Sequence, residues 1–320
     1  MRVESRLVNG GHRGKDELPD GDRAIRLSHP NAARRRLKEL IGYTAMRRML
    51  VALVIAVALS APSSAATVDG LTIHSSSTGS GPATIVFIHG WTCDSSSWAA
   101  QVPAFAKKYR VVTLDLPGHG KSALPKDGKF SMDLFARAVE AVRAETKAER
   151  VVLVGHSMGA PVIRQYARLY PQHVAGLVAV DGPLDMRTFA LPQSNQGPPP
   201  MTGPEGLKAR EGMIRGMFTP QTPVPLQKQI LSMMLTTSEV TAAGAMASIM
   251  DPSLRSPDVI RAPAYAVYAG TGQVPNAQTT REVLPNYDAA QIAGTGHFLM
   301  MEKPEEFNRL LTAFLDKIKF

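Results

Sequence analysis

Short runs rich in apolar residues alternate with longer amphipathic segments along most of the chain. The apolar runs have the length of strands and lie within residues 83–90, 109–115, 150–155, 174–182, 262–270 and 287–294. The segments between them show the apolar spacing of helices, within residues 132–146, 160–171, 277–285 and 304–318. Apolar strands separated by helices indicate a parallel sheet that is covered on both faces. The pattern therefore predicts an α/β fold with a mostly parallel, doubly wound sheet.

The alternation stops at Pro183 and resumes after about Arg261. The stretch between them is rich in proline, methionine and glutamine, with short helical pieces such as 226–237 and 239–250. A connection of this length between two strands is too long for an ordinary loop. The predicted organisation is therefore a core with an inserted helical cap: core residues 67–182 and 262–320, cap residues 183–261.

The first 66 residues have a targeting pattern rather than the pattern of a folded domain. Two arginines precede a short apolar run and a group of small residues, which is the layout of a secretory signal peptide at residues 46–66. The apolar run is shorter than the roughly 20 residues of a membrane-spanning helix. We expect cleavage after Ala66, export to the periplasm or the medium, and no stable membrane insertion. Residues 1–45 are interpreted as a non-native or disordered extension ahead of a true start at Met46.

Charge and cysteine content narrow the classes of protein further. The formal net charge is +9, but most of the excess lies in residues 1–66, so the core and cap are nearly balanced. Nucleic-acid binding needs a basic face on the folded domain itself, and we therefore expect no nucleic-acid partner. Cys93 is the only cysteine, so an internal disulfide is excluded. We expect Cys93 to be a small buried apolar side chain.

Residues 155–159, Gly-His-Ser-Met-Gly, fit the pattern G-x-S-x-G between an apolar strand and a helix. A sharp strand-to-helix turn holds such a serine in a strained conformation, and side chains two positions away would collide with the backbone. The N-terminus of the following helix offers amide groups where negative charge develops. The pattern predicts that Ser157 is a nucleophile. The alternative is a flexible turn with an incidental serine.

A serine nucleophile requires a base and an oxyanion hole. His297 follows the last strand in a loop of small residues, from which an imidazole can reach the same edge of the sheet as Ser157. The alternative for His297 is a structural role in its loop. The expected oxyanion donors are the amide of Met158, at the start of the helix, and the amide of Trp91, after an earlier strand. The Trp91 side chain is then expected to line an acyl pocket.

Four motifs follow one another along the chain: "HGW…SW", "DLPGHGKS", "GHSMG" and "GTGHFLMMEKPEEF". In this order and spacing they resemble the α/β-hydrolase superfamily, in particular its capped group of esterases, lipases, cofactor-free haloperoxidases and carbon–carbon bond hydrolases. The resemblance covers nearly all of residues 67–320 except the cap. It implies Ser157 as nucleophile, His297 as base, and Trp91 and Met158 as oxyanion donors. The implied reaction requires no metal or organic cofactor.

The sequence departs from the superfamily at the acid of the triad. Members usually carry an aspartate beyond the strand that precedes the last helix and strand, but residues 268–276, YAGTGQVPN, contain no carboxylate. Some relatives take the acid from the end of the preceding strand, where this chain has Asp181. We predict Asp181 as the acid that orients the histidine, with Asp185 as the nearest competitor and Glu302 next. The alternative role of Asp181 is to hold the cap hinge through hydrogen bonds.

These residues predict an exported serine hydrolase that cleaves small-molecule carboxylic esters through an acyl-enzyme on Ser157. Two other hypotheses use the same residues: a cofactor-free perhydrolase or haloperoxidase, and a lactone or carbon–carbon bond hydrolase. A hypothesis of another class is a non-catalytic ligand-binding protein on the hydrolase fold, because the usual acid is missing.

Overall fold

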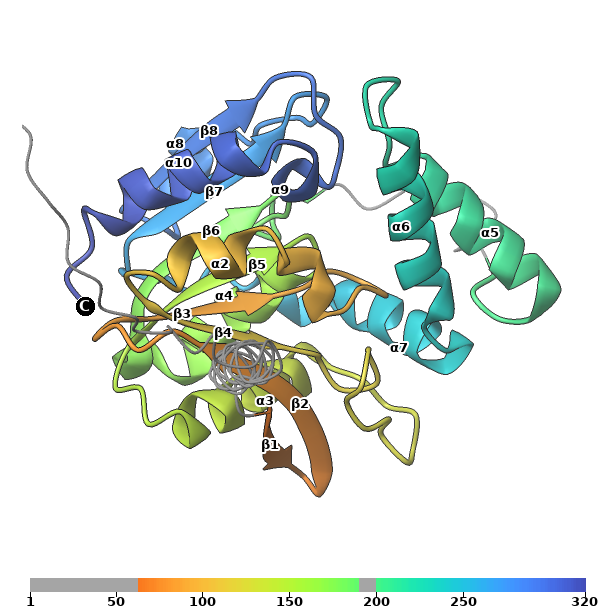
Figure 1. The fold of residues 1–320 in the computed structure, drawn as a ribbon, viewed down its shortest axis with the longest axis horizontal. Helices are drawn as coiled ribbons and strands as arrows, with labels where there is room; N and C mark the ends of the chain where they lie inside the picture. Colours follow the sequence, from red (N-terminus) through yellow and green to blue (C-terminus); the bar gives the residue numbers. More distant parts are fainter. Residues whose placement is uncertain (1–62, 190–199) are drawn as a thin grey trace, which may run out of the picture. The chain divides into compact units, whose positions relative to one another are not determined.

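The computed structural model describes residues 63–189 and 200–320, and within them eight strands form one mixed sheet (Figure 1). The strands are β1 (Ser63–Val68), β2 (Leu71–Thr78), β3 (Thr84–Ile88), β4 (Arg110–Leu114), β5 (Val151–His156), β6 (Val174–Val180), β7 (Ala264–Ala269) and β8 (Tyr287–Ile292). Their order across the sheet is β1-β2-β4-β3-β5-β6-β7-β8. β2 runs antiparallel to β1 and β4, and the other neighbours are parallel. The predicted α/β class with a mostly parallel sheet is confirmed.

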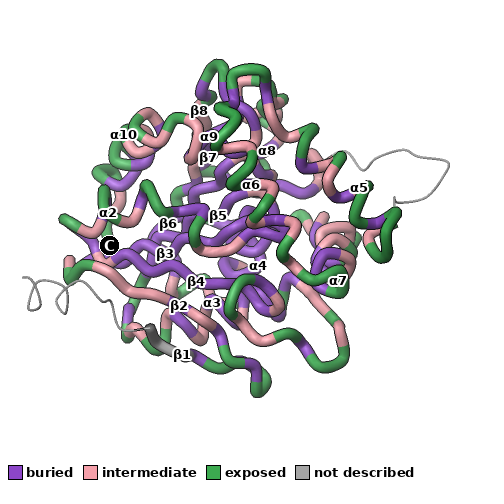
Figure 2. The backbone as a smooth tube through the Cα atoms, turned by 45° about the vertical axis from the view of Figure 1, so that its right-hand side comes forward, coloured by how far each residue is buried: buried purple, intermediate pink, exposed green. Residues whose placement is uncertain are grey.

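Helices cover both faces of this sheet. α3 (Met132–Glu145) packs against α4 (Gly159–Leu169), and α2 (Gln101–Phe105) contacts α10 (Pro304–Leu315). Every residue of β3, β5 and β6 is buried, which requires cover on both sides of these strands (Figure 2). The remaining core helices are short: α8 (Ala277–Arg281), α9 (Leu299–Glu302), and the 3₁₀ turns η1 (Ser95–Trp98) and η2 (Pro171–His173). A third 3₁₀ turn, η3 (Pro252–Arg255), belongs to the insertion between β6 and β7.

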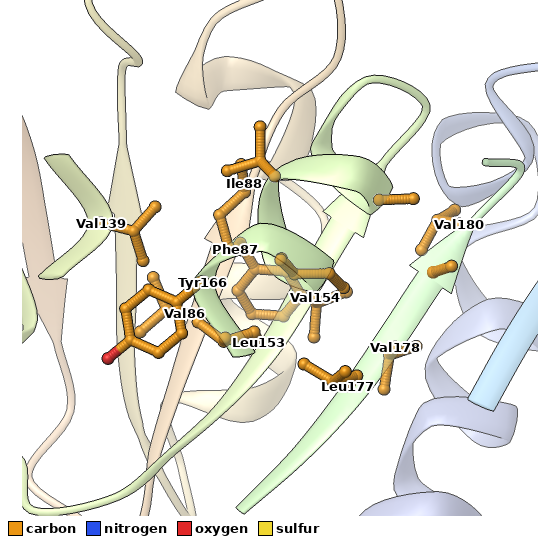
Figure 3. Close-up of a cluster of buried hydrophobic side chains, with 14 of the residues drawn as sticks. Val86, Phe87, Ile88, Val139, Leu153, Val154, Tyr166, Leu177, Val178 and Val180 are labelled. Atoms are coloured by element: carbon orange, nitrogen blue, oxygen red, sulfur yellow. The ribbon is translucent and has the colours of Figure 1, made fainter. Parts of the chain in front are cut away.

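The hydrophobic core holds the central strands in place (Figure 3). Side chains from three neighbouring strands and two helices meet there, and all of them are at most 1% exposed. They include Val86, Phe87 and Ile88 of β3, Leu153 and Val154 of β5, Leu177, Val178 and Val180 of β6, Val139 of α3 and Tyr166 of α4. Interiors packed in this way resist displacement. The residues that follow β5 and β6 therefore begin from fixed positions.

The helical insertion lies between β6 and β7, as predicted. It contains α5 (Gly203–Arg215), α6 (Val224–Thr236) and α7 (Glu239–Ile249), which stand to the right of the sheet in Figure 1. The start of α7 is attached to core loops through three hydrogen bonds: Trp91 Nε1 to the Ala242 carbonyl (2.8 Å), Thr241 Oγ1 to the Gly118 carbonyl (3.0 Å) and Thr237 Oγ1 to the Thr92 carbonyl (2.9 Å).

The helices of the cap are short compared with a membrane-spanning helix. Among the described residues no single helix is long and apolar enough to cross a membrane, although the bent pair Val224–Thr236 and Glu239–Arg255 reaches that length and composition when taken together.

The predicted extension and most of the predicted signal peptide lie outside the described residues, and both stay predictions. Residues Ser63 to Ala66, at the end of that signal peptide, belong to β1 and pair with residues 73–76 of β2. Ala66 is 3% exposed. A mature chain that begins at Thr67 would therefore keep only the last two residues of this strand.

We expect a chain that begins at Thr67 to be less stable than one that begins at Ser63. The shorter chain loses ladder hydrogen bonds worth about 1 kcal/mol each and the burial of Ala66, so its free energy of unfolding should fall by about 2 to 4 kcal/mol. Urea unfolding of the two purified chains measures the difference. Equal unfolding free energies would show that β1 adds nothing to the fold.

Candidate active site

Ser157 lies in a sharp turn between β5 and α4. Its φ of +52° is in the left-handed region that a non-glycine residue seldom adopts. The neighbouring glycines have no room for a side chain: a Cβ at Gly155 would collide with the Gly159 carbonyl, and a Cβ at Gly159 would lie 2.7 Å from the Ile88 carbonyl oxygen. The turn therefore has the strained geometry that the G-x-S-x-G pattern predicts, and it presents a half-buried serine at the carboxyl edge of the sheet.

His297 and Asp181 form a hydrogen-bonded pair at the same edge. Asp181 follows β6, and His297 lies between β8 and α9. His297 Nδ1 donates to Asp181 Oδ2 over 2.6 Å, and the Ala269 amide donates to Asp181 Oδ1 over 2.8 Å. The Ser157 amide donates to the Val180 carbonyl over 2.8 Å, so the serine lies beside the strand end that is followed by Asp181. Three residues that are far apart in the sequence therefore lie close together.

The surroundings of Asp181 favour its ionised form. Burial alone would raise the pKa of this carboxyl, but the hydrogen bond and charge of His297, together with the Ala269 amide, outweigh burial and hold the pKa below its ordinary value. A carboxylate at this position keeps the proton of the His297 ring on Nδ1 and leaves Nε2 able to accept one. The pair thus has the geometry of an oriented general base.

A second histidine, His156, holds the loop that contains His297. His156 Nε2 donates to the His297 carbonyl over 2.9 Å, and the two ring centroids are 4.8 Å apart. Burial lowers the pKa of His156 to about 3, so its ring stays neutral near pH 7. No sequence pattern gave His156 a role. The signal that was available is its position in the motif, immediately before Ser157.

The two competing carboxylates have other partners. Asp185 is 2% exposed and forms an ion pair with Arg187, with 2.9 Å between Oδ2 and the guanidinium nitrogen. Glu302 accepts hydrogen bonds from the Gly296 amide at 3.0 and 3.1 Å. Of the three candidate acids, Asp181 is the one whose carboxylate reaches the His297 ring.

The expected oxyanion donors lie beside the serine. The amides of Trp91 and Met158 donate no hydrogen bond to any group in the described part of the chain, so both remain available to a ligand. Gly90, immediately before Trp91, lies so close to the serine that a Cβ added to it would be 3.1 Å from Ser157 Cβ. The two loops therefore approach each other as an oxyanion hole requires.

The side chain of Trp91 differs from the expectation that it lines an acyl pocket. It is 4% exposed, and its indole nitrogen donates to the Ala242 carbonyl of α7. Because a buried indole N–H needs an acceptor, the cap helix supplies one. Trp91 therefore attaches the cap to the core. Cys93 is 1% exposed, and burial raises the pKa of its thiol, as expected of an unreactive cysteine.

The serine and the histidine are neighbours without a direct hydrogen bond. Across residues 63–189 and 200–320, the Ser157 hydroxyl and the His297 ring make none to each other. Such contacts commonly tighten only when substrate binds. The same residues contain no cluster of three or more histidine, cysteine, aspartate or glutamate side chains that could hold a metal ion.

Three buried histidines are expected to lower stability in mild acid. Burial lowers the pKa of His89, and it lowers the pKa of both His156 and His119 to about 3, whereas the ordinary value is 6.5. Between these values the unfolded chain binds more protons than the folded chain, so the free energy of unfolding falls as the pH drops below about 6.5. We expect a slope of about 1.4 kcal/mol per pH unit for each histidine.

Urea unfolding at pH 7.5, 6.5 and 5.5 measures this slope. The His119→Gln variant is expected to lose about a third of it, because one of the three titrating rings is gone. An unfolding free energy that does not change between pH 6.5 and 5.5 would contradict the neutral, buried state of these three rings.

A mostly parallel sheet, a helical insertion after β6 and a strained serine at the carboxyl edge together define the class of α/β hydrolases. A family profile described as alpha/beta hydrolase fold matches residues 83–204. A 2-hydroxy-6-oxononadienedioate/2-hydroxy-6-oxononatrienedioate hydrolase of Paraburkholderia phymatum is 30% identical, over 77% of this chain and 91% of that protein. The chain belongs to the α/β-hydrolase fold superfamily, as its motifs indicated.

Two further similarities extend over most of the chain. A dihydrolipoyllysine-residue acetyltransferase component of an acetoin cleaving system, from Cupriavidus necator, is 29% identical over 78% of this chain and 68% of that protein. The solved structure of Est816, described as an N-acyl homoserine lactone degrading enzyme, has a TM-score of 0.64 and 25% identity, over 78% of this chain and 100% of that one. The chain is thus a hydrolase-fold protein whose relatives include hydrolases of several substrates.

Proposed function

We propose that this chain is a serine hydrolase that cleaves carboxylic esters through an acyl-enzyme on Ser157. The observation that supports this most strongly is the 2.6 Å hydrogen bond between His297 Nδ1 and Asp181 Oδ2, beside a serine in a strained strand-to-helix turn. A partly buried, ionised carboxylate that orients an imidazole is the arrangement that converts a weak serine hydroxyl into a nucleophile.

The reaction proceeds in two steps. In the first, His297 Nε2 takes the proton of the Ser157 hydroxyl as Oγ attacks the ester carbonyl, and the amides of Trp91 and Met158 stabilise the negative oxygen that forms. His297 then gives the proton to the departing alcohol, which leaves the acyl group on Ser157. In the second step, a water molecule loses a proton to His297 and attacks the acyl group. The acid product leaves and the serine is restored.

A series of p-nitrophenyl esters of increasing acyl length tests this proposal on the chain from Ser63 onward. We expect hydrolysis of at least the short members, with saturation kinetics and no added metal. If no member of the series is cleaved faster than in buffer, the esterase proposal fails. Reaction with a fluorophosphonate distinguishes a serine hydrolase from a non-catalytic ligand-binding protein on the same fold, because an unactivated serine does not react with this reagent.

Lactones are a second candidate class of substrate. The structure of Est816, a lactone degrading enzyme by its description, matches this chain along all of its own length. A lactone is an internal ester, so the same acyl-enzyme would open its ring. Comparing kcat/KM for a lactone series with that for the p-nitrophenyl esters distinguishes the two classes. Halogenation of monochlorodimedone in acetate and peroxide tests the perhydrolase alternative in the same preparation.

A further inference from the structure

Glu302 is attached to the loop of His297 without touching the imidazole ring. Both of its carboxylate oxygens accept from the Gly296 amide, at 3.0 and 3.1 Å. Its own amide donates to the Phe298 carbonyl over 2.9 Å. The residues before and after His297 are therefore both bonded to Glu302, whose side chain reaches back from the end of α9.

The same carboxylate is bonded to the cap. Thr222 Oγ1, which belongs to the turn between α5 and α6, donates to Glu302 Oε2 over 3.1 Å. The Thr222 hydroxyl also accepts from the Thr219 amide over 2.9 Å and lies 3.3 Å from the Thr219 hydroxyl. Because a carboxylate can only accept, the proton of Thr222 points at Glu302 when the Thr219 hydroxyl is the donor of that contact. Both threonines are buried, with exposures of 2% and 7%. Thr222 thus lies in a closed turn that fixes the direction of its hydroxyl.

A second contact joins this turn to the histidine itself. The His297 amide donates to the Met217 carbonyl over 3.1 Å. The approach is so close that a Cβ at Gly296 would lie 2.6 Å from the Met217 carbonyl oxygen. The backbone of the His297 loop is therefore held by residues 217–222 of the cap on one side and by His156 of the core on the other, while Asp181 holds the His297 ring.

We propose that Glu302 is a positioning residue that couples the cap to His297, so that the histidine is aligned only while residues 217–222 are seated on its loop. This inference rests on the proposed serine hydrolase function. Because Thr222, Met217 and Glu302 form one set of contacts, displacement of the cap turn loosens the Gly296 and His297 amides together.

The Thr222→Val variant tests the coupling because it keeps the volume of the side chain and removes the hydroxyl. We expect kcat to fall about tenfold with KM changed less than about twofold, since the base is misaligned while the binding surface remains. Thr222→Ser should restore kcat because it returns the hydroxyl. Thr236→Val is the matched control: the Thr236 hydroxyl bonds only to the Ser232 carbonyl within α6, and its loss should leave kcat unchanged.

Glu302→Met provides an independent measurement. Methionine keeps the length of the side chain but has no oxygen, so it loses the acceptor that both the Gly296 amide and the Thr222 hydroxyl use. We expect a loss of kcat at least as large as that of Thr222→Val, and no additional loss when Thr222→Val is combined with it. The downfield proton signal of His297 Nδ1, in its hydrogen bond to Asp181, should broaden in both variants and remain sharp in Thr236→Val.

Two outcomes would overturn the coupling. One is a Thr222→Val variant with wild-type kcat and an unchanged His297 signal. The other is additive losses in the double variant. Both are distinct from a failure of the proposed function, in which the wild-type chain itself neither hydrolyses esters nor reacts with a fluorophosphonate at Ser157.

Discussion

Replacement of Ser157 by alanine is expected to lower kcat for ester hydrolysis at least about 10,000-fold, because no other group can form the acyl-enzyme. The oxyanion hole and the binding surface stay in place, so a small residual rate above that of water is expected. The loss is measured as kcat on the best p-nitrophenyl ester of the series.

The fold of the alanine variant provides the control. The Ser157 hydroxyl makes no hydrogen bond within the described residues, so its removal should leave the melting temperature nearly unchanged. A Ser157→Ala variant that melts like the parent and hydrolyses esters at the parent rate would contradict the assignment of Ser157 as the nucleophile.

The second large effect is expected for Asp181→Asn, with a loss of about 1,000- to 10,000-fold in kcat. An asparagine can donate a hydrogen bond to His297 Nδ1, which places the ring proton on Nε2 and blocks acceptance of the Ser157 proton. Its oxygen can still accept from the Ala269 amide, so the strand end should remain intact. Asp185→Asn, which alters a carboxylate already paired with Arg187, is the comparison and should retain most activity.

A carboxylate placed on the neighbouring loop should compensate in part. A Cβ at Gly272 would lie 3.3 Å from Asp181 Oδ1, so an aspartate there brings its carboxylate into the same space. We expect the double variant Asp181→Ala with Gly272→Asp, in which the smaller residue at 181 leaves this space open, to recover at least about tenfold in kcat over Asp181→Ala alone. Near-full turnover by Asp181→Asn itself would contradict the role of this residue in orienting the histidine.

The central strands could be predicted from sequence because their burial is complete. β3, β5 and β6 are buried at every position, and their apolar runs reflect this directly. α5 was not predicted, since Gly206 and Gly212 lie within it and read as turn residues. Its packing against α6 supplies the stability that its own low helix propensity does not provide. The beginning of β1 was assigned to the signal peptide because its small residues are compatible both with a cleavage site and with a strand.

The candidate site also contains some residues that could be predicted from sequence and some that could not. The positions of Ser157 and His297 follow from local motifs, and the choice of Asp181 followed from its place at a strand end. The contacts of Trp91 with Ala242 and of Glu302 with Thr222 join residues 151 and 80 positions apart. No local pattern encodes such pairings, because they depend on how the cap is seated on the core. His156 was missed for the same reason, since its partner is a carbonyl 141 positions away.

The most direct test of the central claim is the reaction of the chain with a fluorophosphonate, followed by mass spectrometry of the peptides. We expect a single adduct on Ser157, formed at least about 100-fold more slowly in Asp181→Asn and His297→Ala. An adduct at another residue, or an adduct on Ser157 that forms at the same rate in all three proteins, would contradict the assignment of Ser157, His297 and Asp181.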